Sequence, residues 1–143
     1  MASPRVTLEE VQRYAAKWIP RLHLCDWEIE FRVAHIPGAV AGHCSSEFRR
    51  RVARITLDPT VHRLKDLPIT SGIRAGRVLE GVVVHELLHI HRQPHEDQLR
   101  NLIWKDGEQE PESWVLFQDF DETVIDTTVR VLLEADATGG WSK

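Results

Sequence analysis

The chain has 143 residues, of which 42% are hydrophobic, and this is the size and content of one domain with a single core. Its formal net charge of −4, with both signs spread along the chain, argues against a nucleic-acid partner, and two cysteines cannot define a disulfide framework. No stretch is apolar for long enough to cross a bilayer, and the first residues lack a signal-peptide core. We therefore expect a cytoplasmic protein without a membrane partner.

The N-terminal part of the chain predicts a helix followed by a small sheet. Thr7 and Glu10 form a capping-box pattern, and helical periodicity then continues as far as Pro20. Three segments with turn residues between them are typical of short strands: 27–34, 39–48 and 51–58. Because they follow one another closely, they predict an antiparallel meander of about three strands.

Two long helices are predicted in the second part of the chain. The first runs from about Ala75 to Arg92 and is apolar on almost every side, which is typical of a buried helix. A short helix near residues 96–104 follows, and the second long helix covers about 112–135. This order of elements predicts a single α+β domain over residues 1–143, with a largely antiparallel sheet.

The predicted buried helix contains polar residues that need partners. In the sequence HELLH, His85 and His89 lie one helical turn apart on the same side, with Glu86 beside them. Two neutral imidazoles at this spacing can bind a zinc ion from one side, and the neighbouring carboxylate can take a proton from water at the metal. Because burial of such groups without partners is unfavourable, the motif predicts a Zn²⁺ site on this helix.

A zinc site of this kind needs a third protein ligand, and the sequence leaves two candidates open. Glu122 and Asp126 lie four residues apart and share a helix stripe with core positions, so both should face inward. Glu122 can bind the metal, while Asp126 can accept a hydrogen bond from a ligand histidine and fix its tautomer. His95 is the alternative third ligand, if the helix breaks after His89 and turns back.

The HELLH motif and the downstream sequence ETVID, residues 122–126, resemble the gluzincin group of zinc metallopeptidases. The small size and the order of elements are similar to minimal gluzincins and to short metallopeptidase-like proteins of phage and bacterial genomes. The specific part of the resemblance covers about 78–92 and 119–133. It implies a zincin-like fold with the following roles: His85, His89 and Glu122 as zinc ligands, Glu86 as general base, and Asp126 as support for a ligand histidine.

The resemblance implies a zinc metalloendopeptidase that hydrolyses peptide bonds in a peptide or protein substrate. The substrate is expected to lie extended along an edge strand, for which residues 39–48 are the candidate. Larger members of the group also have a residue that stabilises the tetrahedral intermediate, and four residues are candidates for it: Tyr14, His43, Arg92 and His95. The alternative function is a metal-binding zincin-like domain with a structural or regulatory role and little proteolysis.

Overall fold

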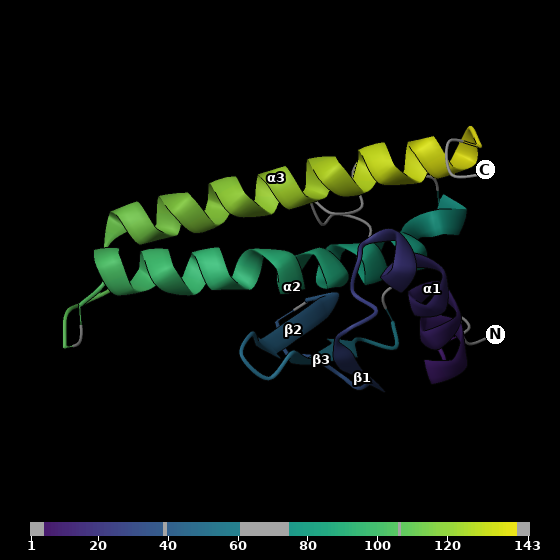
Figure 1. Ribbon diagram of the computed structural model, residues 1–143, viewed down its shortest axis with the longest axis horizontal. Coiled ribbons are helices and arrows are strands. Elements are labelled where there is room, and N and C mark those ends of the chain that lie inside the picture. The colour runs from purple at the N-terminus through teal and green to yellow at the C-terminus, as the bar shows by residue number, and fades with distance from the viewer. Residues whose placement is uncertain (1–4, 39, 61–74, 106, 140–143) are drawn as a thin grey trace.

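The structure is a computed structural model that describes residues 5–38, 40–60, 75–105 and 107–139 (Figure 1). Within these residues it is an α+β fold, as predicted, with three α-helices and a small three-stranded sheet. None of the helices within these ranges is long and apolar enough to cross a membrane. The elements are, in chain order, α1 (Leu8–Arg21), β1 (Glu28–Val33), β2 (Gly42–Glu47), β3 (Val52–Leu57), the 3₁₀ turn η3 (Ala75–Arg77), α2 (Val78–Ile103) and α3 (Glu112–Ala137).

The predicted N-terminal helix is confirmed as α1. The backbone N–H of Glu10 donates to Oγ1 of Thr7 at 3.2 Å, and the backbone N–H of Thr7 donates to the Glu10 carboxylate, also at 3.2 Å. This reciprocal capping box begins the helix. Pro20 lies inside the last turn, and the helix ends one residue later. Its buried stripe consists of Val11, Ala15 and Trp18.

The sheet is mixed, which corrects the prediction of an antiparallel meander. Its strand order is β1-β3-β2, so the last strand in the chain lies in the middle. β2 and β3 pair antiparallel, but β1 pairs with β3 in parallel, with Phe31 opposite Ile55. Alternation of apolar and polar residues identifies the buried face of a strand and not the direction of its neighbour. Within the described residues β2 pairs with β3 alone and is therefore an edge strand.

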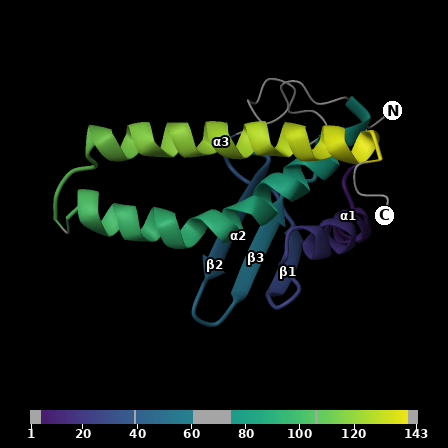
Figure 2. The same cartoon turned by 45° about the horizontal axis from the view of Figure 1, so that its top comes forward.

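Helix α2 is longer than the sequence predicted. It runs without a break from Val78 to Ile103 and includes Pro94, so the separate short helix near 96–104 does not exist. Proline lacks a backbone N–H and frequently ends or kinks a helix. Here α3 runs beside the C-terminal half of α2 (Figures 1 and 2). This packing of one helix on the other outweighs the tendency of Pro94 to end the helix.

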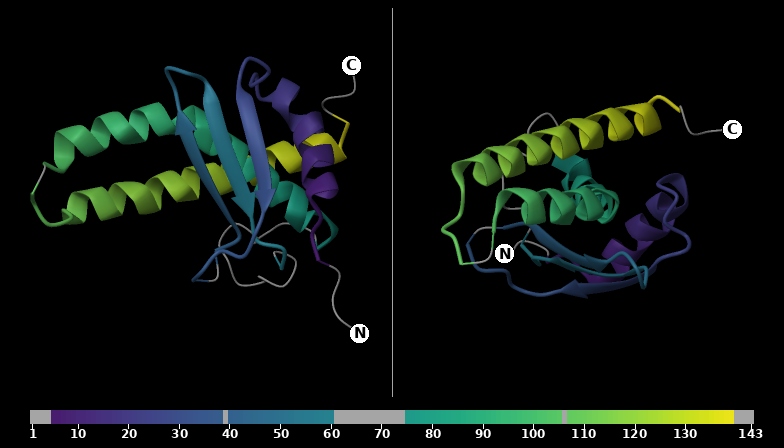
Figure 3. Two further views of the ribbon diagram at one scale, coloured as in Figure 1. Left: turned by 90° about the horizontal axis from the view of Figure 1, so that it is seen from below. Right: turned by 60° about the vertical axis from the view of Figure 1, so that its left-hand side comes forward.

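The core lies where α2 crosses the sheet. Every residue from Leu79 to Leu87 is buried, which confirms the prediction of a helix that is apolar and covered on all sides. The fully buried Ile55 and Leu57 of the central strand belong to the same core. Figure 3 shows that α2 lies between the sheet and α3, so its side chains can meet both layers.

An ionic cluster joins the three helices near the N-terminal end of α2. The buried Glu80 accepts hydrogen bonds from Trp18 Nε1 and Lys17 Nζ, both at 2.7 Å, and a further one from Arg77. Lys17 also donates to Asp136 at 2.8 Å, and this contact, opposed by partial burial, lowers the pKa of Asp136 to about 2. The cluster fixes the C-terminal end of α3 against α1 and α2.

Candidate metal centre

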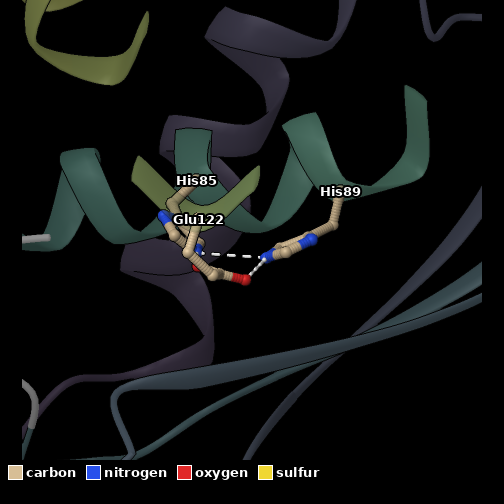
Figure 4. Close-up of side chains that lie close together, drawn as sticks. All are labelled: His85, His89 and Glu122. Atoms are coloured by element: carbon tan, nitrogen blue, oxygen red, sulfur yellow. Dashed lines mark hydrogen bonds and ion pairs between the residues drawn. The ribbon is translucent and has the colours of Figure 1, made fainter. Parts of the chain in front are cut away.

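Three side chains that the sequence analysis assigned as ligands lie together between α2 and α3 (Figure 4). Nε2 of His85 and Nε2 of His89 are 3.1 Å apart. The two carboxylate oxygens of Glu122 lie 3.1 Å from the first of these nitrogens and 3.0 Å from the second. The ligand atoms of the group all lie within 4.8 Å of one another, so the three residues could hold a metal ion.

The spacing and chemistry of this group fit a zinc ion. Zinc binds imidazole nitrogen and carboxylate oxygen in tetrahedral geometry at about 2.0–2.2 Å, so its neighbouring ligand atoms lie about 3.3 Å apart. The separations of 3.0–3.1 Å in the group are close to that value. Two nitrogens and one carboxylate also suit cobalt or nickel. Because these electron-rich atoms face one another, a metal ion or protons on the imidazoles would relieve their repulsion.

Asp126 lies behind His85, where the sequence placed it. Its Oδ1 is 2.9 Å from Nδ1 of His85. The two atoms are close but lack the alignment of a hydrogen bond. Both are buried, and neither Nδ1 of His85 nor Oδ1 of Asp126 has a hydrogen-bond partner among the described residues. A carboxylate in this position favours the tautomer with the proton on Nδ1 and leaves Nε2 to face the other ligands.

The negative charges around the two imidazoles raise their pKa values. Burial lowers the pKa of His85, but Asp126 and Glu122 more than offset this effect and raise it to about 9. Burial likewise opposes the effect of Glu122 and Glu96 on His89, whose pKa rises to about 10. Despite its own desolvation, Glu122 has a pKa well below its usual range because both imidazoles contact it. A metal ion at this position would therefore displace protons from the imidazoles.

The carboxylate of Glu86 lies beside the group and is almost fully buried, with the residue 4% exposed. Its Oε1 is 4.0 Å from Nε2 of His85. Burial raises the pKa of Glu86 and the two imidazoles lower it, and the net shift is upward. A raised pKa moves a carboxyl group toward the range in which it can both accept and return a proton, as a general base must.

Strand β2 approaches the Glu86 carboxylate most closely at Gly42. A Cβ atom at position 42 would lie 3.0 Å from both Cγ and Oε1 of Glu86, and 3.1 Å from its Cδ. Contacts this short do not persist without a shift of one partner. A side chain at residue 42 would therefore require the Glu86 carboxylate or the strand to shift.

His85, His89 and Glu122 form the candidate metal-binding group, which lies in a cleft of about 780 Å³ between β2, α2 and α3. Ala41, His43 and Cys44 line it from the strand side, and Gln93 and Asp119 line it from the two helices. None of the lining residues in the described part of the chain is Lys or Arg, although several are carboxylates. The cleft therefore combines a group that could hold a metal ion with an acidic surface.

Of the four candidates for stabilising a tetrahedral intermediate, only His43 lines this cleft. Arg92 is engaged elsewhere, because its Nε donates to Asp121 at 2.7 Å. Tyr14 packs against the hydrophobic core on α1. His95 is exposed on the continuous part of α2, which does not turn back, and it is not part of the metal-binding group.

The sequence did not predict the position of Glu96, whose Oε1 lies 3.7 Å from Nδ1 of His89. The sequence contains a signal for this contact, because Glu96 lies seven positions after His89 and this spacing corresponds to about two helical turns. It becomes visible only if the helix continues past Pro94, whereas the sequence predicted that the helix would end before it.

Comparisons with known protein families, with curated proteins and with solved structures find nothing that matches this chain. The geometry and chemistry of the site are therefore the basis for a proposed function. A likeness in fold alone would be a weaker basis, because one fold can support many activities.

Proposed function

We propose that the chain is a zinc-dependent metallopeptidase with a zincin-like fold. Its zinc ligands are His85, His89 and Glu122, and its general base is Glu86. The observation that carries the proposal is the convergence of the three ligand atoms from two helices, at separations of 3.0–3.1 Å. The buried carboxylate of Glu86 lies beside them in the same cleft, and this favours hydrolysis over a structural or regulatory role of the metal.

The chain's own residues supply the proton transfers of such a reaction. Bound zinc supplies a Lewis acid that polarises the substrate carbonyl and makes water a stronger acid. Glu86 accepts a proton from the attacking water and later returns it to the nitrogen of the leaving amine. Its raised pKa suits the second of these transfers. Asp126 holds His85 in the tautomer that leaves Nε2 free to act as a ligand.

The position of β2 supports an extended peptide as substrate. β2 is an edge strand within the described residues, and its residues Gly42 and His43 line the cleft next to Glu86. A peptide that adds to such an edge gains main-chain hydrogen bonds irrespective of its sequence, and pockets then select among side chains. The scissile bond would in this way be brought to the general base.

Metal analysis combined with a peptide-cleavage assay tests the proposal. Purified protein loaded with zinc should contain one metal ion per chain, and it should cleave a mixture of unstructured peptides followed by mass spectrometry. A strong zinc chelator should stop the cleavage, and added zinc should restore it. Bound metal without any cleavage would favour the structural or regulatory alternative. A protein that binds no metal would rule out both functions.

Replacing Gly42 by alanine should lower peptide cleavage by about tenfold to a hundredfold without changing the metal content, because small displacements of a catalytic group have effects of this size. The added Cβ would contact the Glu86 carboxylate at 3.0 Å and displace it. Initial rates of peptide cleavage and elemental analysis of the purified variant measure the two quantities.

The matched control for this change is Gly76→Ala. A Cβ at Gly76 has nothing within 4 Å, and this residue lies in η3, outside the cleft. Gly76→Ala should therefore keep the cleavage rate of the original protein. Equal rates for the two alanine variants would show that the close approach at Gly42 does not position Glu86.

A further inference from the structure

Three charged residues that the proposed mechanism does not use lie behind His89. The carboxylate of Glu96 is 3.7 Å from Nδ1 of His89, which is an ion-pair distance and longer than a hydrogen bond. The carboxyl groups of Glu96 and Asp121 interact, since each of them shifts the pKa of the other. Arg92 donates to Asp121 through Nε at 2.7 Å and through Nη2. These residues form a continuous chain of contacts that leads from α3 to the metal-binding group.

The continuity of α2 makes this arrangement possible. At 100° per residue, Glu96 lies only about 20° round the helix from His89 and about two turns further along. Side chains on a helix lean toward its N-terminus, so the Glu96 carboxylate leans back toward the imidazole. If α2 ended at Pro94, nothing would place Glu96 on this stripe.

The burial of the three residues indicates how their charges are distributed. Asp121 is 2% exposed and would be unfavourable as an isolated charge, but the guanidinium of Arg92 contacts it directly. The side chain of Glu96 is 24% exposed and has no Lys or Arg partner among its described contacts. Its ion-pair contact among the described residues is with Nδ1 of His89.

We propose that Glu96 is a positioning residue of the metal centre. It turns the His89 ring so that Nδ1 faces Glu96 and Nε2 faces the metal, and Asp121 and Arg92 hold Glu96 in place. Each histidine ligand then has its own carboxylate behind it, Asp126 for His85 and Glu96 for His89. Carboxylates in such positions contribute about tenfold to a hundredfold to metal affinity. This inference rests on the metal centre of the proposed function.

Zinc affinity, measured by competition with a chromophoric chelator, tests the inference. Glu96→Ala should weaken zinc binding by about tenfold to a hundredfold. Glu96→Gln keeps an acceptor oxygen at the same place and should recover most of that loss. The matched control is Asp97→Ala, which removes the neighbouring carboxylate from the exposed side of the same helix and should leave the affinity unchanged.

A spectroscopic measurement separates positioning from a merely structural role. With cobalt in place of zinc, the visible absorption bands of the metal should shift in Glu96→Ala and remain unchanged in Asp97→Ala. A structural role would lower the melting temperature of the metal-free protein and leave these bands in place. If Glu96→Ala fails to fold, nitrogen-15 spectra of the zinc-loaded original protein still decide, because His89 should carry a proton on Nδ1 and the contact with Glu96 should slow the exchange of this proton with solvent.

The outcomes also separate this inference from the function on which it rests. An original protein that binds no metal would overturn both. An original protein that binds zinc, together with a Glu96→Ala variant of equal zinc affinity and unchanged cobalt spectrum, would overturn the role of Glu96 alone. A His89 ring without a proton on Nδ1 in the zinc-loaded protein would have the same consequence.

Discussion

Replacement of Glu86 by glutamine is expected to reduce peptide cleavage by about 10²–10⁴-fold, while the variant still binds one metal ion per chain. Glutamine has nearly the same shape as glutamate but cannot accept the proton that the reaction transfers. Glu86 is not among the three residues of the metal-binding group, and its side chain is buried beside them. Steady-state cleavage of a peptide and elemental analysis of the same preparation give the two quantities.

Asp97→Asn provides the control for this change, because it neutralises an exposed carboxylate on the same helix, outside the cleft. This control variant should cleave peptides at the original rate. Unchanged cleavage by Glu86→Gln would remove the residue from the mechanism. Loss of metal together with activity would instead mean that Glu86 acts by supporting the ligands.

Replacement of Glu122 by alanine is expected to weaken zinc binding by more than about a hundredfold, since loss of a ligand should exceed the loss of a supporting residue. The two imidazoles of His85 and His89 would remain, but two nitrogens from adjacent turns of one helix hold zinc weakly without a third ligand. Competition titration measures the affinity, and peptide cleavage should disappear at zinc concentrations that saturate the original protein.

Two further variants make this measurement specific. Asp119→Ala removes an acidic residue from the same helix and the same cleft, but it leaves the metal-binding group intact and should keep the affinity. His95→Ala should also keep it, because His95 is exposed on α2, outside that group. If His95→Ala lost zinc and Glu122→Ala kept it, the third ligand would have to be reassigned.

The parts of the site that the sequence predicted are those that depend on one helix at a time. His85, Glu86 and His89 follow from their spacing within a single apolar helix, and the structure places them together. Glu122 and Asp126 follow from the stripe that they share with core residues of α3. Asp126 is indeed buried, whereas the side chain of Glu122 is about half exposed, at the rim of the cleft.

The features that the sequence did not predict depend on contacts between elements. The parallel pairing of β1 with β3 depends on which strands become neighbours, and an alternating pattern does not contain this information. The continuation of α2 through Pro94 depends on packing against α3. Because the sequence predicts that the helix ends before Pro94, it does not indicate the contact of Glu96 with His89. The contact of Arg92 with Asp121, which takes Arg92 away from the predicted role at the substrate, depends on the same packing of α2 against α3.

The central position of β3 also determines the order in which the chain can assemble. β1 is synthesised first, yet its only partner among the described strands is β3, which is synthesised last of the three. β2 and β3 are adjacent in sequence and can form a hairpin quickly, whereas β1 must close a much longer loop before it joins them. The hairpin is therefore expected to form first and to serve as the template on which β1 docks. The buried segment from Leu79 to Leu87 follows all three strands in the chain, so the strands that cover it are synthesised before it.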